Sequence, residues 1–311
     1  MNELLTKENL DYQERAREVA EKYVRPVAAE LDRTGEYGWE ILEALKSYGL
    51  TGVWIPKEYG GQDAGVLNLC LIVEQLSRAC GGVGVAFAVN ALGSFPIILG
   101  GTEEQKQKYL PPIAAGEHLI AFGLSEKASG SDAGSLRTTG IKDGDDYVIN
   151  GSKTYISNGQ NADLIVVVAK TDPSLGAKGI SLIVVEADSE GFRRGRNLKK
   201  LGQPSADTSE LFFDDCRVPQ DNRLGDQEGQ GFVQLMQQLP QERLSIAQAA
   251  VVETERAIAV TLDFVKERKA FGQRVLDFQN TKFKLAECKT EALVARTFVD
   301  QCVLKHLEGK L

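Results

Sequence analysis

The pattern of hydrophobic and polar residues changes twice along the chain. Up to about residue 118, apolar residues such as Ala16, Val19 and Tyr23 recur at helical spacing, with charged residues between them. Short apolar runs separated by turn residues follow, and then the helical period returns. The pattern predicts an α+β protein of three domains: an N-terminal all-α domain over 1–118, a middle antiparallel β-barrel domain over 119–225, and a C-terminal α-helical bundle over 226–311.

The ends of several helices are marked by local signals. Pro26 should kink or divide the first helix, because proline cannot donate the backbone hydrogen bond that an interior position requires. Thr102 and Gln105 form a capping box that should open another helix. The stretch 83–101 approaches the length of a membrane span, but Asn90 and Pro96 interrupt it, so a buried helix and its exit turn explain it better than a span.

Turn signals and a proline shape the predictions for the rest of the chain. Asp143-Gly144 and Asn150-Gly151 are dipeptides typical of hairpin turns in the middle domain. Further on, 232–268 is predicted to form one very long helix, which could kink or break at Pro240. A second long helix is expected over 276–307, and the C-terminal bundle is expected to be incomplete.

Composition and charge narrow the class of protein. Hydrophobic residues make up 42% of the 311 residues, which is typical of a folded protein, and a net charge of −8 argues against nucleic-acid binding. The five cysteines form no Cys-x-x-Cys pair, so we expect free buried thiols in a reducing compartment. The two histidines are far apart in sequence, and we therefore expect no metal site. No secretory signal follows Met1, which favours the cytoplasm or the mitochondrial matrix.

The stretch 123–135 is rich in glycine and serine and lies at the start of the β domain. It offers backbone N–H groups, hydroxyl groups and small residues that allow a ligand to approach closely. From these properties alone, a loop that binds an anion or a cofactor and a surface loop of turn-forming residues are about equally favoured.

Several motifs, in order along the whole chain, resemble the acyl-CoA dehydrogenase family. The segment Gly-Leu-Ser-Glu-x-x-Ser-Gly-Ser-Asp at 123–132 is similar to the first signature of this family, and Tyr-Ile-Ser-Asn-Gly at 155–159 resembles its second flavin-contact strand. Glu-Arg-Lys-Ala-Phe-Gly-Gln at 267–273 is similar to a motif at the end of the first long C-terminal helix. The stretch 237–247 is closest to the long-chain type, and the chain resembles this family without the end of its C-terminal domain.

The resemblance implies FAD as cofactor and assigns its binding residues. Those within one subunit would be Phe122, Leu124, Ser125, Gly130, Ser131, Tyr155, Ile156 and Ser157. Those that reach the FAD of a neighbouring subunit would be Arg268, Phe271 and Gln279. This sharing implies a homotetramer built as a dimer of dimers.

Glu242 is the candidate general base. It is spaced with Leu235, Leu239 and Ile246 on what the pattern predicts to be an apolar stripe, where burial would raise the pKa of its carboxyl group. The helix pattern alone favours a glutamate paired with a lysine or arginine at the edge of the stripe. The resemblance to the long-chain type favours the base, which would remove the α-proton of an acyl-CoA thioester while a β-hydride passes to the flavin.

The remaining assignments also follow from the resemblance. Ser131, Gln241 and Arg243 would bind the acyl-CoA substrate, although an ion pair with an acidic side chain is an alternative for Arg243. The implied product is a trans-2-enoyl-CoA of medium or long chain in fatty acid β-oxidation, and the implied electron acceptor is an electron-transferring flavoprotein. Two alternatives are a related flavoenzyme such as an acyl-CoA oxidase and a non-catalytic flavin-binding homologue.

Overall fold

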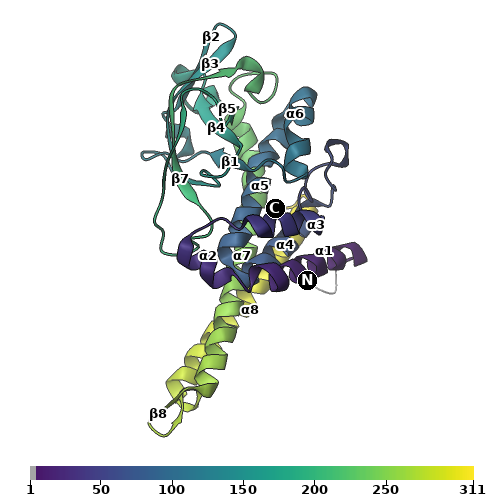
Figure 1. The fold of residues 1–311 in the computed structure, drawn as a ribbon, viewed down its shortest axis with the longest axis vertical. Helices are drawn as coiled ribbons and strands as arrows, with labels where there is room; N and C mark the ends of the chain where they lie inside the picture. The colour runs from purple at the N-terminus through teal and green to yellow at the C-terminus, as the bar shows by residue number, and fades with distance from the viewer. Residues whose placement is uncertain (1–4) are drawn as a thin grey trace.

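Helices form the first part of the chain in the structure, a computed structural model that describes residues 5–311 (Figure 1). Thr6 and Asn9 form a capping box at the start of the first helix, and Thr102 and Gln105 form the predicted one at the start of α6. Pro26 follows a π-helical turn and separates α1 from α2, as predicted. The elements are α1 (Lys7–Val19), η2 (Ala20–Val24), α2 (Ala28–Thr34), α3 (Trp39–Ser47), α4 (Gly65–Ala79), α5 (Gly81–Gly100) and α6 (Glu103–Ala114).

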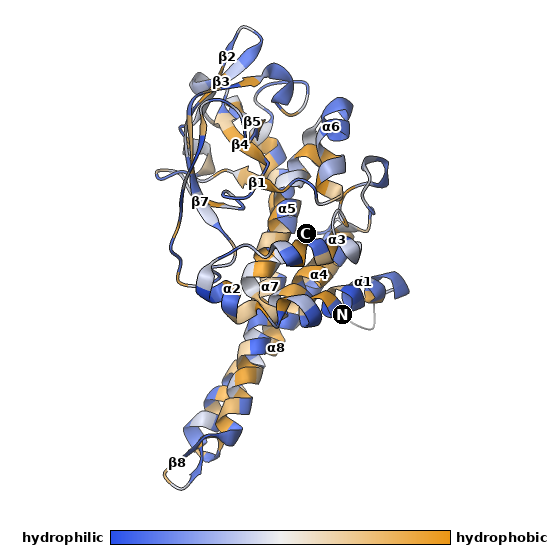
Figure 2. Cartoon of the chain, viewed as in Figure 1, coloured by the Kyte–Doolittle hydropathy of each residue, from blue (hydrophilic) through white to orange (hydrophobic). Residues whose placement is uncertain are grey.

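Helix α5 is the central helix of the fold. It is the one helix of the described chain that is long and apolar enough to cross a membrane, yet 78% of its most apolar stretch is buried. It packs against α4, α6, α7 and strand β1, and Figure 2 shows its hydrophobic residues at the junction of the helices with the sheet. The Trp54 indole donates a hydrogen bond of 2.7 Å to the hydroxyl of Ser94 on α5. A core helix is therefore the interpretation that the structure supports.

A curled sheet forms the middle of the chain. Its order is β1-β4-β2-β3-β7-β6, with β5 paired to β4. Most pairs are antiparallel, as predicted, but β1 and β2 each pair with β4 in parallel. The strands are β1 (Ile120–Gly123), β2 (Thr139–Asp143), β3 (Asp146–Ser157), β4 (Leu164–Lys170), β5 (Ile180–Glu186), β6 (Phe192–Asn197) and β7 (Thr208–Pro219).

One of the two predicted hairpin turns is correct. The chain turns from β2 to β3 directly after Asp143, through Gly144 and Asp145, and Gly144 has a φ of 63° that suits this turn. The prediction for Asn150-Gly151 is wrong, because both residues lie inside the twelve-residue strand β3. The register of β3 against β7 shifts between Ile149 and Gly151, so the glycine marks a bulge. A Cβ atom at position 151 would lie 2.6 Å from the Thr138 hydroxyl oxygen, which explains why a glycine occupies the bulge.

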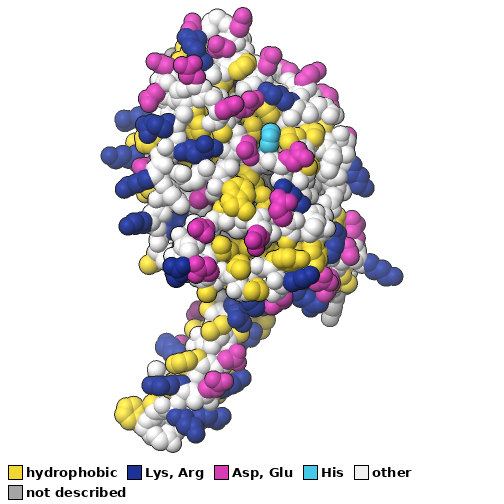
Figure 3. Space-filling view, viewed as in Figure 1, with side chains coloured by type: hydrophobic (Ala, Val, Ile, Leu, Met, Phe, Trp, Pro, Cys, Tyr) yellow, Lys and Arg dark blue, Asp and Glu magenta, His cyan; other side chains and the backbone are white. Residues whose placement is uncertain are grey.

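Two long helices form a protruding arm at the C-terminal end (Figure 1). Helix α7 (Gly231–Glu267) is continuous across Pro240, so the proline does not break it. A short hairpin of β8 (Lys269–Ala270) and β9 (Gln273–Arg274) joins it to α8 (Gln279–Leu307) at the tip of the arm. Figure 3 shows charged and hydrophobic side chains interspersed on the surface of this arm.

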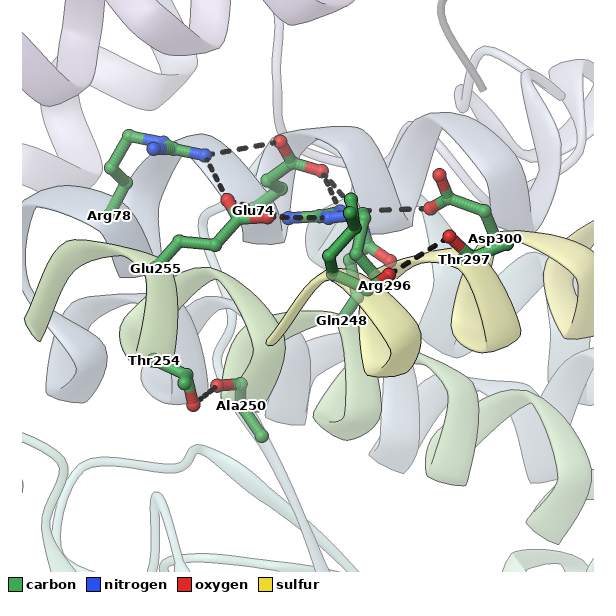
Figure 4. Close-up of polar contacts among 10 residues, drawn as sticks. Glu74, Arg78, Gln248, Ala250, Thr254, Glu255, Arg296, Thr297 and Asp300 are labelled. Atoms are coloured by element: carbon green, nitrogen blue, oxygen red, sulfur yellow. Dashed lines mark hydrogen bonds and ion pairs between the residues drawn. The ribbon is translucent and has the colours of Figure 1, made fainter. Parts of the chain in front are cut away.

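A network of charged side chains ties α4, α7 and α8 together where the arm meets the body of the molecule (Figure 4). Arg296 on α8 donates to Glu255 on α7 and to Glu74 on α4, each at 3.0 Å. Arg78 donates to Glu255 at 3.0 Å, and the Gln248 amide donates to Glu74. These contacts fix the direction of α8 relative to the helical body.

The five cysteines are free thiols, as expected. Cys70 and Cys216 are buried, whereas Cys288 is exposed on α8. The expectation that all five thiols are buried is therefore wrong for Cys288, because α8 projects away from the core and leaves much of its surface uncovered.

Candidate functional site

A buried ion pair anchors the glycine- and serine-rich loop to the sheet. The Lys153 ammonium group on β3 lies 2.7 Å from Glu126 Oε1 in the loop, and their side chains are 0% and 7% exposed. Glu126 also accepts hydrogen bonds from the backbone N–H groups of Arg137 and Thr138. Burial lowers the pKa of Lys153, and Glu126 opposes this shift. The pair thus fixes both ends of the loop against one strand.

The same loop lies against the segment that resembles the second flavin-contact strand. The Thr154 backbone N–H donates to the Ser125 carbonyl oxygen at 2.9 Å, and the Lys153 ammonium group donates to the Leu124 carbonyl oxygen at 3.2 Å. Phe122 is buried at the end of β1, directly before this loop. The structure therefore brings the predicted residues at 122–125 and at 155–157 side by side.

Tyr155 presents its ring to the surface at an irregularity in β3. The register against β7 shifts between Lys153 and Ile156, and Tyr155 has a φ of 60°, which is uncommon for a residue other than glycine. The Tyr155 side chain is 72% exposed, whereas Ile156 is only 2% exposed. The shift thus turns an aromatic ring outward beside the loop.

These surface features fit the isoalloxazine ring and the phosphates of FAD. The exposed Tyr155 ring offers a flat apolar face, and the partly exposed Leu124 and Ser125 lie next to the strand that carries it. Gly130 and Ser131 are exposed at the tip of the loop, and a Cβ atom at Gly130 would meet no atom within 4 Å. Backbone groups at this position are therefore open to a phosphate or a hydroxyl group. No cluster of metal-ligating side chains occurs in residues 5–311.

The three residues predicted to serve a neighbouring subunit lie elsewhere. Arg268 directly follows α7, Phe271 lies in the β8–β9 hairpin and Gln279 begins α8, at the tip of the arm and far from the large sheet (Figure 1). Phe271 is 96% exposed and has a φ of 50°. Within one chain, the structure does not bring these residues to the loop or to Tyr155.

Glu242 lines an apolar pocket between helices α4, α5 and α7. The pocket and the open space at its mouth together have an empty volume of about 330 Å³. Its other lining residues are mostly apolar: Leu69 on α4, Ala88, Val89, Ala91, Leu92 and Phe95 on α5, and Gln241, Ser245 and Ile246 on α7. A carboxyl group beside a pocket of this kind loses much of its hydration, and an apolar chain is the ligand that such walls favour.

The environment of Glu242 raises the pKa of its carboxyl group to about 7, and burial is the cause. The side chain of Gln238 and the Arg243 guanidinium group oppose this rise. The predicted apolar stripe explains the burial only in part, because Ile246 is 52% exposed. The desolvation comes instead from the walls that α4 and α5 contribute across the pocket.

The two neighbours of Glu242 in sequence differ in their surroundings. Gln241 is 9% exposed and lines the same pocket, so it lies where a ligand of the pocket would pass. Arg243 is exposed, and no ion pair of Arg243 with an acidic side chain occurs in the described part of the chain. The two side chains therefore lie on opposite sides of Glu242, one inside the pocket and one in solvent.

Sequence reasoning missed three residues around these two regions. Glu126 belongs to the motif that carries the resemblance, but its partner Lys153 is 27 residues away and no local signal connects them. Gln238 is fully buried one helical turn before Glu242, although glutamine usually lies at the surface. Its spacing of four residues from Glu242 is the signal that could have identified it.

Comparison with known proteins shows to which family this chain belongs. The models of the acyl-CoA dehydrogenase N-terminal, middle and C-terminal domains match residues 6–117, 121–216 and 229–311. An acyl-CoA dehydrogenase of Bacillus subtilis (strain 168) is 40% identical over 98% of this chain and 80% of its own length. The mitochondrial long-chain specific acyl-CoA dehydrogenase of Sus scrofa is 39% identical over 96% of this chain and 70% of its own length.

Solved structures that resemble this chain point to the same family as these relatives. Butyryl-CoA dehydrogenase from Megasphaera elsdenii superimposes with a TM-score of 0.92 at 38% identity, over 99% of this chain and 81% of that chain. A chain from work on the electron transferring flavoprotein of Acidaminococcus fermentans gives a TM-score of 0.93 at 40% identity, with the same coverage. The succession of helices, curled sheet and helices, the flavin-compatible surface and these matches lead to one conclusion: the chain belongs to the acyl-CoA dehydrogenase family of FAD-dependent oxidoreductases.

Proposed function

We propose that this chain oxidises the Cα–Cβ bond of a medium- or long-chain acyl-CoA to the trans-2-enoyl-CoA in fatty acid β-oxidation, with Glu242 as the general base. The observation that carries the proposal is the position of Glu242 on the wall of an apolar pocket, with a pKa of about 7. A base with this pKa is partly ionised at neutral pH and still basic enough to accept a proton. The apolar walls would hold the acyl chain beside it.

The residues around Glu242 would hold the rest of the substrate. Gln241 would contact the pantetheine arm at the mouth of the pocket, and the solvent-exposed Arg243 would attract the negatively charged coenzyme A. Ser131 would contribute a further substrate contact from the loop of the sheet. Together these groups would fix the α-carbon of the thioester near the Glu242 carboxylate, which is the main requirement for proton transfer.

FAD, when bound, supplies the acceptor for the β-hydride. We propose that Phe122, Leu124, Ser125, Gly130 and Ser131 hold it on one side, and that 155–157 lie against its isoalloxazine ring on the other. The hydrogen bond between the Thr154 N–H and the Ser125 carbonyl supports this division, because it keeps the two segments in contact. The exposed ring of Tyr155 supports it as well.

The Glu242→Gln variant tests the proposal. Glutamine keeps the volume of the side chain but cannot accept the α-proton, and loss of one general base typically lowers a rate about 10²- to 10⁴-fold. We expect the variant to bind FAD and acyl-CoA, and to reduce its flavin at least about 100-fold more slowly than the parent. Anaerobic stopped-flow measurement of flavin bleaching gives this rate directly.

Glu253→Gln is the matched control for this experiment. Glu253 is a partly buried carboxyl group on the same helix, its pKa is also raised by burial, and it does not line the pocket. We expect it to retain the parental rate. If Glu242→Gln bleaches its flavin as fast as the parent, the base is another group. If it fails to bind FAD, Glu242 has a structural role.

The length of the preferred acyl chain can be measured in the same way. The pocket lies between α4, α5 and α7, and the relatives of this chain include both a butyryl-CoA dehydrogenase and a long-chain enzyme. We expect anaerobic bleaching by acyl-CoAs of graded length to be fastest for a medium or long chain. Fastest bleaching by butyryl-CoA would instead assign a short-chain substrate.

The proposed electron acceptor is an electron-transferring flavoprotein in the bacterial cytoplasm or the mitochondrial matrix. The similarity to a chain from work on the flavoprotein of Acidaminococcus fermentans supports this partner. We expect substrate-reduced enzyme to pass electrons to such a flavoprotein with little oxygen consumption. Rapid oxygen consumption with production of hydrogen peroxide would support the alternative, an acyl-CoA oxidase.

A further inference from the structure

Gln238 is the most unusual buried side chain outside the residues assigned above. It is 0% exposed on α7, and neither its Nε2 nor its Oε1 atom has a hydrogen-bond partner among residues 5–311. A buried amide group without partners has lost its hydrogen bonds to water and gained none in exchange, so such groups are rare and often have a functional reason. The neighbour that could provide a partner is Glu242.

Glu242 has a matching unsatisfied atom. Its Oε1 is buried and has no hydrogen-bond partner in the described chain. Gln238 precedes it by four residues on the same helix, so the two Cβ atoms are about 5–6 Å apart and the side chains lie on one face. The Gln238 amide is close enough to oppose the rise of the Glu242 pKa, yet no hydrogen bond of acceptable geometry joins them.

The other polar side chains of the pocket, Gln241 and Ser245, lie on α7 with Glu242, and the Ser245 hydroxyl donates to the Glu242 backbone carbonyl oxygen, not to the carboxylate. The side chains that α4 and α5 present there are all apolar, and α5 carries no charged residue. On α4 and α8, the charged side chains Glu74, Arg296 and Asp300 pair with one another in the network around Gln248 (Figure 4). On α7 itself, Arg243 is the charged group that acts on Glu242.

We propose that Gln238 is a positioning residue for the reaction proposed above: its amide N–H donates to the ionised Glu242 carboxylate, which orients the carboxylate and stabilises it in an apolar pocket. A donor of this kind favours the charged form of a carboxyl group. Without it, only Arg243 would oppose the effect of burial on the Glu242 pKa, and a larger fraction of the enzyme would carry a protonated, inactive base at neutral pH. The inference rests on Glu242 being the base.

The Gln238→Met variant tests this role, because methionine has a similar length and no hydrogen-bonding amide. A hydrogen bond to a charged group shifts a pKa by roughly one unit, so the Glu242 pKa should rise by about that amount. The rate of flavin reduction by acyl-CoA should then fall about tenfold at pH 6, about fivefold at pH 7, and hardly at all above pH 9. A purely structural role would lower the rate equally at every pH.

Gln237→Met is the matched control, since Gln237 is exposed on the same helix and should leave the profile unchanged. If Gln238→Met does not fold, Gln238→Leu serves in its place. A second readout needs no turnover: ¹³C-glutamate NMR of the FAD-loaded protein, with the Glu242 signal assigned by its loss in Glu242→Gln, reports the pKa directly. An upward shift in the Gln238 variant supports the proposal, and an unchanged pKa overturns it. Failure of the proposed function would show separately, as a parental rate in Glu242→Gln.

Discussion

At the scale of single residues, the contact between Lys153 and Glu126 determines where the glycine- and serine-rich loop lies. Both side chains are buried. Besides its contact with the ammonium group, the Glu126 carboxylate accepts hydrogen bonds from two backbone N–H groups and from the Thr138 hydroxyl. One carboxylate therefore holds both the start of the loop and the strand segment that follows it. The loop depends on this pair for its position beside Tyr155.

The Lys153→Met variant tests the importance of this pair. It leaves the Glu126 carboxylate buried without its counter-charge, which typically lowers the free energy of unfolding by about 3–5 kcal/mol. We expect this loss in urea-induced unfolding, together with weaker FAD retention on gel filtration. Adding Glu126→Gln to Lys153→Met removes the unpaired buried charge and should recover part of the stability. If the double variant is as unstable as the single one, packing of the Lys153 side chain is the cause.

At the scale of elements, the arrangement of α4, α7 and α8 depends on long-range charge pairs. Arg296 and Arg78 hold the pKa of Glu255 below its usual range, although burial alone would raise it. A carboxyl group with a lowered pKa in the folded state stabilises the fold at pH values above its unfolded pKa. That contribution is lost as the pH falls below about 4.5. Acid should therefore loosen the base of the arm.

The Arg296→Leu variant should reproduce this loosening at neutral pH. Glu74 and Glu255 would lose their shared partner in a mostly buried position, at a cost of about 2–3 kcal/mol in the free energy of unfolding. We expect faster amide hydrogen exchange along α8 and a smaller acid dependence than in the parent. Arg274→Ala is the control, because its ion pair with Asp277 is exposed and should contribute little to the free energy of unfolding. Unchanged exchange in α8 would show that apolar packing alone holds the helix.

At the scale of the whole molecule, the arm carries the residues proposed to complete a second subunit's flavin site. Arg268, Phe271 and Gln279 lie at its tip, away from the loop and Tyr155 of the same chain (Figure 1). Large apolar side chains such as Phe264, Phe283 and Phe298 are also exposed on α7 and α8. Surfaces of this kind commonly mark contacts between subunits, and we propose at least a dimer and a homotetramer as the active form.

The Phe271→Ala variant tests this assembly. Phe271 is 96% exposed, so its loss should change the free energy of unfolding by less than about 0.5 kcal/mol. If it contacts the FAD of a neighbouring subunit, the FAD content after dilution should fall, while light scattering still reports the parental oligomer. Leu201→Ala, a change at an exposed residue away from the arm, should retain its FAD. A monomeric parent that keeps one FAD per chain at low concentration would contradict the proposal.

The sequence by itself determined the succession of elements, because helix and strand periods, capping boxes and the Asp143-Gly144 turn depend on neighbours a few residues apart. It also made Glu242 the candidate general base, through a resemblance of motifs. Only the tertiary structure decided how β1 pairs with β4, that Gly151 lies in a bulge, and which walls bury Glu242. These features arise from contacts between residues far apart in sequence, such as Lys153 with Glu126 and α5 across from α7. Local periodicity carries no information about such partners, so the desolvation that raises the pKa of the proposed base appeared only once the helices were packed.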